Sequence, residues 1–196
     1  MNFLAHFHLA WPDEGMIAGG LEGDYFKGPL CGQLPLNLEL GVKLHRAIDA
    51  YTDTHPLIGQ LRSDLPPDLR RYSGILIDLS FDHYLSLHWS NFSVSPLSVF
   101  NRDVYRILNR QKASLSVGAR TMLQRLVEYD VLNLYAEWEM VLATAKRIGT
   151  RFKRHNPFLE LEHSLSPAKA SLEEVFLSFY PQVQSFSQEW ALNLRE

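Results

Sequence analysis

The chain has very little of what several classes of protein depend on. It contains one cysteine, Cys31, among 196 residues, which excludes a disulfide framework and any zinc site of the CxxC type. No run approaches the roughly 20 consecutive apolar residues that a membrane-spanning helix needs. Neither a GxxxxGK[ST] phosphate loop nor a GxSxG nucleophile elbow occurs, so P-loop and α/β-hydrolase chemistry are excluded.

The beginning of the chain also lacks the pattern of a secretory signal. The first ten residues, MNFLAHFHLA, contain two histidines and no basic start. A single cysteine fits a reducing compartment. We therefore expect a cytoplasmic protein.

The composition and the spacing of apolar residues predict a helical domain. Apolar residues make up 46% of the chain, which supports a packed core and excludes intrinsic disorder. Apolar side chains recur three and four residues apart at 100–108, at 172–179 and along one long helix at 134–152, and strand alternation is scarce. We expect one all-α domain, a helical bundle that spans residues 1–196.

Glycine and proline mark the predicted breaks between helices. Nine of the eleven glycines lie in residues 15–74, so irregular backbone is expected mainly in the first third of the chain. The segment 27–35 reads as a loop between two helices. Pro181 is expected to end or kink the last helical segment.

The net charge of −3 conceals a basic middle region. Residues 1–101 carry a net charge of −5, residues 102–154 carry +6 and residues 155–196 carry −4. A local basic surface suits an anionic partner, although ordinary solvated helix faces would give the same pattern. The residues we expect to form such a surface are Arg102, Arg106, Arg110, Lys146, Arg147, Arg151, Lys153 and Arg154.

Histidine and aspartate gather in the N-terminal half, where six of the eight histidines lie within the first ninety residues. His45 and Asp49 are four residues apart, so they lie one turn apart on the same side of a helix. An imidazole and a carboxylate at this spacing can bind one metal ion. A pair at the solvent edge is the alternative.

A second helical row is Ile75, Asp78, Asp82, Leu85 and Trp89, in which two carboxylates interrupt an apolar stripe. Burying them unpaired would cost several kcal/mol. They therefore need a metal ion, which His83 would help to bind, or protonation, or an ion pair. The candidate ion-pair partners are Arg46, Arg62 and Arg71.

Four segments in the first ninety residues resemble the acyl carrier protein phosphodiesterase family. The segments are MNFLAHFHLA, GDYFKG from Gly23, LHRAIDAYTDTHP from Leu44 and DLSFDHYLSLHW from Asp78. The chain departs from the family pattern at Gly20, where asparagine is common, and at Tyr25, where phenylalanine is usual. Residues 91–196 match mainly in length and helical character.

The resemblance implies a fold, a metal and a reaction. It implies a helical fold distantly related to the HD-domain phosphohydrolases, a divalent metal that is usually manganese, with magnesium as a second candidate, and an essential aspartate at Asp24. The implied reaction hydrolyses the phosphodiester that links 4′-phosphopantetheine to a serine of holo-acyl carrier protein. No nucleic-acid or membrane partner is expected.

Metal-assisted phosphodiester hydrolysis needs histidine and aspartate ligands and no covalent side-chain nucleophile. We assign the metal to His6, Asp24, His45, Asp78 and Asp82, and we assign catalytic or supporting roles to Asp24, Asp49 and His83. The first alternative is a helical metal phosphohydrolase that acts on a nucleotide or another small phosphoester. The second is a protein that binds acyl carrier protein without catalysis.

Overall fold

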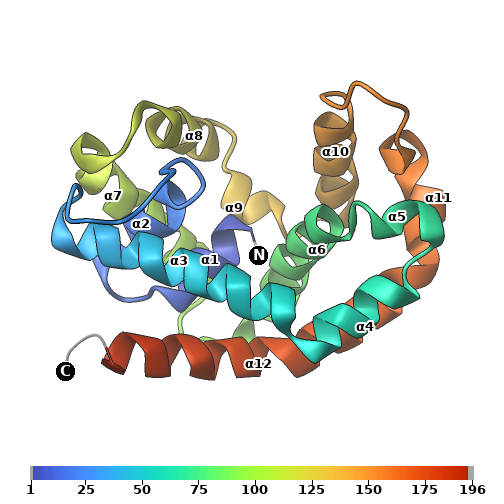
Figure 1. Cartoon of the computed structure of the whole chain (residues 1–196), viewed down its shortest axis with the longest axis horizontal. Coiled ribbons are helices and arrows are strands. Elements are labelled where there is room, and N and C mark those ends of the chain that lie inside the picture. Colours follow the sequence, from blue (N-terminus) through green and yellow to red (C-terminus); the bar gives the residue numbers. More distant parts are fainter. Residues whose placement is uncertain (1, 194–196) are drawn as a thin grey trace.

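Helices account for all the regular secondary structure of residues 2–193, the part of the chain that the computed structural model describes (Figure 1). The prediction of an all-α fold is therefore confirmed. The α-helices are α1 (Phe3–Leu9), α2 (Glu14–Glu22), α3 (Leu36–Thr54), α4 (Pro56–Asp64), α5 (Pro67–Arg70), α6 (Ser73–Leu87), α7 (Leu97–Gln111), α8 (Val117–Glu128), α9 (Val131–Leu134), α10 (Trp138–Gly149), α11 (Leu161–Leu165) and α12 (Lys169–Asn193). Short 3-10 helices occupy Trp89–Asn91, Lys112–Ser114, Pro157–Glu160 and Ser166–Ala168.

The helices α2 and α3 cross at a pair of glycines. A Cβ atom on Gly19 would lie 2.5 Å from the Cα of Gly41, and one on Gly41 would lie 2.5 Å from the carbonyl oxygen of Met16. Only glycine permits so close an approach of two helix backbones. This contact fixes α2 against the first half of α3.

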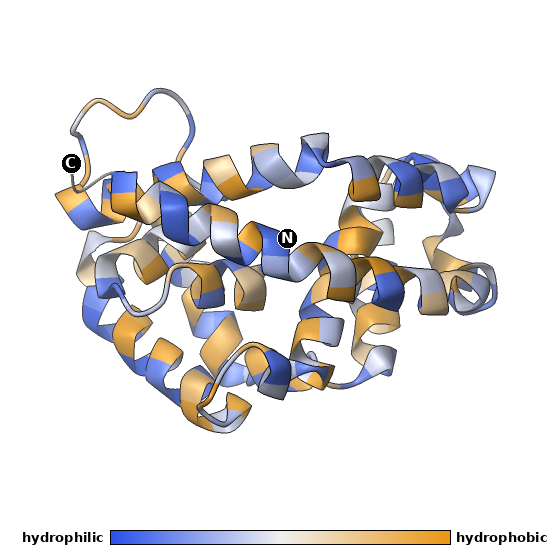
Figure 2. Ribbon diagram, turned by 90° about the horizontal axis from the view of Figure 1, so that it is seen from below, coloured by the Kyte–Doolittle hydropathy of each residue, from blue (hydrophilic) through white to orange (hydrophobic). Residues whose placement is uncertain are grey.

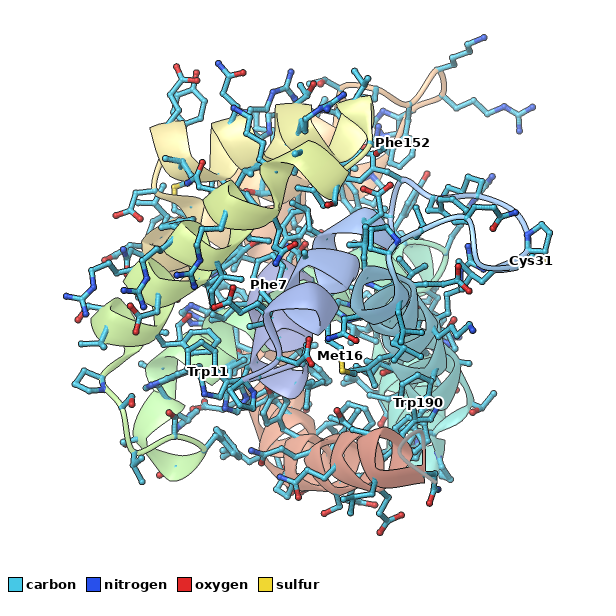
Figure 3. The ribbon with its side chains drawn as sticks, turned by 90° about the vertical axis from the view of Figure 1, so that its left-hand side faces the viewer. Phe7, Trp11, Met16, Cys31, Phe152 and Trp190 are labelled. Atoms are coloured by element: carbon cyan, nitrogen blue, oxygen red, sulfur yellow. The ribbon has the colours of Figure 1, made fainter. Side chains whose placement is uncertain are left out.

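The short helix α1 lies in the middle of the fold, packed against α2, α6 and α12. Its side chains Leu4, Ala5 and Phe7 are fully buried, and Figure 3 shows Phe7 among the helices of the interior. Because only Phe7 separates His6 from His8, the two histidines leave α1 in different directions. His6 stacks on His45, whereas His8 contacts Trp89 and Tyr180.

Asp82 on α6 caps the N-terminus of α1. Its Oδ2 accepts a hydrogen bond of 2.8 Å from the backbone N–H of Leu4, and its Oδ1 accepts one of 3.1 Å from that of Ala5. The residue that precedes the helix, Asn2, supplies no side-chain cap. The carboxylate of a distant helix thus satisfies N–H groups that a helix start leaves without partners.

The structure corrects the predicted long helix at 134–152, which is divided into α9 and α10 by the turn at 135–137. Phe152 lies beyond the end of α10. Asn156 explains that end, since its Nδ2 donates a 3.0 Å hydrogen bond to the carbonyl of Gly149. A Cβ atom on Gly149 would lie 2.6 Å from Asn156 Oδ1, so this cap requires glycine at the last helical position.

Pro181 was predicted to end or kink its helix, and it does not end it, because α12 continues through it to Asn193. Proline removes one backbone hydrogen bond from a helix. The neighbouring side chains Phe179, Tyr180 and Val183 are fully buried, and tertiary packing of this kind contributes most of a helix's stability in a folded protein. The loop predicted at 27–35 is confirmed, since it joins α2 to α3.

Hydrophobic and hydrophilic residues alternate along most helices (Figure 2), as expected where one face packs inward. Within residues 2–193, no helix is both long enough and apolar enough to cross a membrane. Cys31 lies exposed on the loop between α2 and α3, at the edge of the molecule in Figure 3.

The buried carboxylate of Asp82 makes a pH-dependent contribution to stability. Burial raises the pKa of Asp82 to about 7 from an ordinary 3.8, against the opposing effect of the two N–H donors. The folded state therefore holds the proton more tightly than the unfolded chain. For such a group, stability is full below pH 4 and is lost as the pH rises to about 7.

We predict that Asp82→Asn removes this pH dependence. Between pH 4 and pH 7, the unfolding free energy of the unaltered protein should fall by on the order of 2–4 kcal/mol more than that of the variant. Urea unfolding of both proteins at several pH values in this range measures the difference. A constant difference would mean that Asp82 is already ionised in the folded protein at acidic pH.

Candidate metal centre

The site begins where the end of α2 meets His45 on α3. The Nδ1 atom of His45 lies 3.0 Å from the carbonyl oxygen of Gly20. A carbonyl only accepts hydrogen bonds, so Nδ1 carries a proton and donates it. In the neutral ring, Nε2 is then left with its lone pair, which is the arrangement found in histidines that bind metals.

Glycine at position 23 allows this contact. A Cβ atom on Gly23 would lie 2.4 Å from Cγ of His45 and 2.5 Å from its Cδ2. Any larger residue would therefore displace the imidazole. Gly20 accepts the hydrogen bond from His45 through its backbone carbonyl. Glycine in place of the family's common asparagine therefore leaves this hydrogen bond intact.

His6 of α1 stacks on His45, with ring centroids 4.0 Å apart and planes inclined by 21°. His6 is buried, and neither of its ring nitrogens has a hydrogen bond of ordinary geometry among the described residues. Burial, together with the charge of the neighbouring His45, lowers the pKa of His6 to about 3. The ring is therefore neutral at pH 7 and has a lone pair available.

Asp49 completes a group of three. Its Oδ1 lies 3.2 Å from Nε2 of His6, and its Oδ2 lies 3.2 Å from Nε2 of His45. Burial acts to raise the pKa of Asp49, but its contacts with His45 and His6 outweigh burial and hold the pKa well below the ordinary value. Asp49 is therefore ionised at neutral pH.

These three residues form a possible metal site. One ligand atom from each of His6, His45 and Asp49 lies within 4.8 Å of the others. The donors are two imidazoles and a carboxylate, a set that suits several divalent first-row metals. A cation would also give a partner to the lone-pair nitrogen of the buried His6 ring, so the residues fit the group that the resemblance implies.

Asp24 lies beside this cluster, in the turn that follows α2. Its Oδ1 is 3.7 Å from Nε2 of His45, and its side chain is 51% exposed. The partial burial of the Asp24 side chain raises its pKa, and the charge of His45 acts to lower it. Asp24 thus connects the buried cluster with solvent.

An open pocket of about 390 Å³ lies over the cluster. Two of its lining residues, Lys27 and Arg46, are cationic; neither was expected in the site, and Arg46 was expected only as a possible ion-pair partner of Asp78 or Asp82. The complete lining is Gly23, Asp24, Phe26, Lys27, Gly28, His45, Arg46 and Asp49.

Of the site residues predicted from the sequence, the structure brings together His6, Asp24, His45 and Asp49. Asp49, expected in a supporting role, lies in the cluster itself. This arrangement favours the metal-binding interpretation of the His45–Asp49 pair over a simple pair at the solvent edge. The spacing of four residues between His45 and Asp49 on one helix was the feature of the sequence that predicted this pair.

The structure places the α6 residues elsewhere. Asp82 caps α1, and His83 Nδ1 donates a 2.9 Å hydrogen bond to the carbonyl of Tyr135. Burial lowers the pKa of His83. Asp78 is half-buried one turn before Asp82 on α6 and is not part of the three-residue cluster.

Two of the three arginines suggested as ion-pair partners for Asp78 and Asp82, Arg62 and Arg46, have other contacts. Arg62 pairs with Asp53 at 2.6 Å, and Arg46 donates to two backbone carbonyls of the α2–α3 loop. Asp82 instead accepts hydrogen bonds from two backbone N–H groups, and its burial raises its pKa, which favours the protonated form of the carboxyl group. Sequence spacing could not show this, because the donors lie 77 and 78 residues away.

The predicted basic surface is divided between two helices. Arg102 and Arg106 of α7 contact Asp103, and Arg110 pairs with Glu14. The remaining five residues, Lys146, Arg147, Arg151, Lys153 and Arg154, are exposed at the end of α10 and just beyond it. In Figure 1, α7 and α10 lie on opposite sides of the molecule.

Tyr25 shows which basic residues lie near the site. Its ring packs on Gly118 of α8, where a Cβ atom would lie 2.5 Å from Tyr25 Cδ1. Burial raises the pKa of Tyr25, and the positive charges of Arg125 and Arg151 act in the opposite direction but are outweighed. These two arginines therefore lie close to the residue that follows Asp24, and Arg125 was not among the residues expected from the sequence.

The chain is thus a helical protein with a possible His/Asp metal site beside an open pocket, an arrangement that suits a hydrolase. The family model for acyl carrier protein phosphodiesterase matches residues 1–183. This chain belongs to the acyl carrier protein phosphodiesterase family.

Relatives that match over almost their full length carry the same name. The acyl carrier protein phosphodiesterase of Photorhabdus laumondii subsp. laumondii is 42% identical over 182 residues, which are 92% of each chain. That of Yersinia pestis is 28% identical over 189 residues, 96% of this chain and 98% of its own. No solved structure matches, so the relation to HD-domain phosphohydrolases stays a prediction.

We predict that manganese raises the melting temperature of the protein, since a ligand that binds only the folded state stabilises it. The shift should disappear in His45→Ala and in Asp49→Asn. Asp53→Asn is the matched control, because Asp53 lies one turn further along α3 and pairs with Arg62. Thermal unfolding with and without manganese measures the shift, and equal shifts in all four proteins would place the metal elsewhere.

Gly23→Ala should displace the His45 ring, since the added Cβ would overlap it. We expect a loss of about 1–3 kcal/mol of stability together with a manganese affinity at least tenfold weaker. Gly59→Ala, where a Cβ meets nothing within 4 Å, is the control. Calorimetric titration with manganese separates the two, and unchanged affinity in Gly23→Ala would contradict the assigned role of His45.

Proposed function

We propose that this protein hydrolyses the phosphodiester that links 4′-phosphopantetheine to the serine of holo-acyl carrier protein. The observation that carries the proposal is the cluster of His6, His45 and Asp49 beneath a solvent-open pocket, in a chain that matches the family over residues 1–183. Water adds to phosphorus and the bond from phosphorus to the serine oxygen breaks. The products are apo-acyl carrier protein and 4′-phosphopantetheine.

The metal is assigned to His6, His45 and Asp49, with Asp24 as a further candidate ligand at the pocket side. A divalent ion bound there, manganese or magnesium, supplies Lewis-acid stabilisation of phosphate charge and lowers the pKa of water. Gly20 holds His45 through Nδ1, which keeps Nε2 free as the ligand atom. The whole chain, residues 1–196, is proposed as one phosphodiesterase domain.

Asp24 is proposed as the residue that orients the attacking water and accepts its proton. It is the cluster's carboxylate with the greatest exposure to the pocket, and burial raises its pKa. A raised pKa makes a carboxylate a better base near neutral pH. His83 is assigned to the packing of α6 against Tyr135, not to proton transfer.

The partner is proposed to approach the pocket from the side of α8 and α10. Acyl carrier proteins are strongly acidic, so a protein with a net charge of −3 needs a local basic surface to dock one. Arg125 and Arg151 act on Tyr25, the residue next to Asp24. Arg102, Arg106 and Arg110 contact acidic residues of this chain, so their charges are less available to the partner.

Incubation of holo-acyl carrier protein with this protein and manganese should remove the mass of 4′-phosphopantetheine, and excess chelator should prevent the loss. Asp24→Ala should lower kcat by about 100-fold or more without changing the helical circular dichroism spectrum. Mass spectrometry of the carrier protein measures both. Turnover of small phosphoesters without loss of the carrier's prosthetic group would favour the alternative phosphohydrolase function, and binding of the carrier without turnover of either would favour a non-catalytic binder.

Charge reversal at Arg125 and Arg151 should raise KM for holo-acyl carrier protein about tenfold with little change in kcat. The effect should shrink as salt is added, because the Debye length falls to about 8 Å at 0.15 M ionic strength. Steady-state kinetics at low and high salt measure this.

The matched control is the double reversal of Arg102 and Arg106, which lie on α7 and contact Asp103. It should change KM less than twofold. A small phosphodiester should be turned over equally by all three proteins. Equal effects of the two double reversals on the carrier substrate would show that docking does not depend on the α8–α10 side.

A further inference from the structure

Arg46 binds the backbone on both sides of Lys27. Its Nη2 donates a 2.8 Å hydrogen bond to the carbonyl of Phe26, and its Nη1 donates one of 2.9 Å to the carbonyl of Gly28. Arg46 follows His45 directly on α3, so the same helix holds the metal cluster and this part of the loop. Gly28 has a φ of +97°, a conformation that favours glycine.

Lys27 lines the pocket without another role in the fold. Its side chain is exposed, and among residues 2–193 its ammonium group makes neither a hydrogen bond nor an ion pair. Its charge acts on Asp24 across the pocket. The other basic residue that lines the pocket, Arg46, donates to the loop carbonyls, and Lys43 of α3, outside the pocket, pairs with Glu39.

The pocket therefore has two walls of different chemistry. One wall has the carboxylates and imidazole of Asp24, Asp49 and His45, which suit a cation. The other has the free ammonium of Lys27, which suits an anion. A phosphate group between them would contact a metal ion on one side and Lys27 on the other.

We propose that Lys27 binds the phosphate group of the substrate and that Arg46 is the residue that positions it. This inference rests on the proposed function, because it places the scissile phosphodiester in the pocket over Asp24. Lys27 contacts a non-bridging phosphate oxygen through Nζ. Arg46 acts through the loop in this proposal, since each of its two terminal nitrogens donates to a loop carbonyl, that of Phe26 or that of Gly28.

Inorganic phosphate, with manganese present, is the first probe. The dissociation constant for phosphate, measured by calorimetry, should rise tenfold or more in Lys27→Ala and should be largely retained in Lys27→Arg. Manganese affinity without phosphate should be unchanged, which confirms that the variants are folded. Lys43→Ala, which removes a paired lysine of α3 outside the pocket, should bind phosphate like the unaltered protein.

Arg46 is tested by a double-mutant cycle. Arg46→Ala should weaken phosphate binding, and Arg46→Lys should not restore it, because one ammonium group cannot replace a guanidinium that spans two carbonyls. Since Arg46 acts through Lys27, the double variant should bind phosphate no more weakly than Lys27→Ala alone. Additive losses would overturn the positioning role of Arg46.

The same variants distinguish this inference from the proposed function. For holo-acyl carrier protein and for a small phosphodiester, kcat/KM should fall by about 10–100-fold in Lys27→Ala. If phosphate binding depends on Lys27 but the carrier protein is never cleaved, the proposed function fails and the phosphate site stands. Phosphate affinity that is undetectable in the unaltered protein, or equal in Lys27→Ala, would overturn the inference.

Discussion

The hydrogen bond from His45 to the carbonyl of Gly20 is the contact on which the rest of the site depends. It fixes the ring tautomer, directs Nε2 toward Asp49 and requires the end of α2 to lie against α3. Two glycine contacts make that approach possible: the α2–α3 crossing at Gly19 and Gly41, and the absence of a side chain at Gly23. Backbone packing therefore decides the chemistry of His45, which lies four residues after Gly41 on α3.

The second requirement is that α1 is held in place, because it carries His6 into the cluster. A helix of seven residues has little intrinsic stability. Its position comes from buried apolar side chains and from the Asp82 cap. Burial raises the pKa of that carboxyl group, so the protein keeps a buried acid at a cost in stability near neutral pH in order to fix the helix that bears a candidate ligand.

The sequence predicts the helical class and names His6, Asp24, His45 and Asp49, but spacing alone shows only one of the contacts between them, and the reason lies in distance along the chain. The pair His45 and Asp49 is a local pattern, so helical spacing alone is sufficient to find it. The stacking of His6 on His45 joins residues 39 positions apart, and the Asp82 cap joins residues almost 80 apart. No periodicity encodes such contacts, which is why Asp82 and His83 looked like ligands when only their own helix was considered. The proposed roles of Lys27 and Arg46 were missed because they depend on hydrogen bonds from Arg46 to loop carbonyls on either side of Lys27. Such bonds to the backbone leave no pattern in the sequence.

The short segment His45–Asp49 of α3 organises both walls of the pocket. His45 and Asp49, four residues apart, point to one side of the helix and hold the metal-type cluster, while Arg46 is rotated by about 100° and reaches the loop. A rotation of α3 that improved one set of contacts would disturb the other. The Gly19–Gly41 crossing resists such a rotation, since the two backbones have no side chains between them at that point. The candidate metal residues His45 and Asp49 and, through Arg46, the loop that carries Lys27 are thus all held by α3, which is the fixed geometry that the proposed reaction on a phosphate requires.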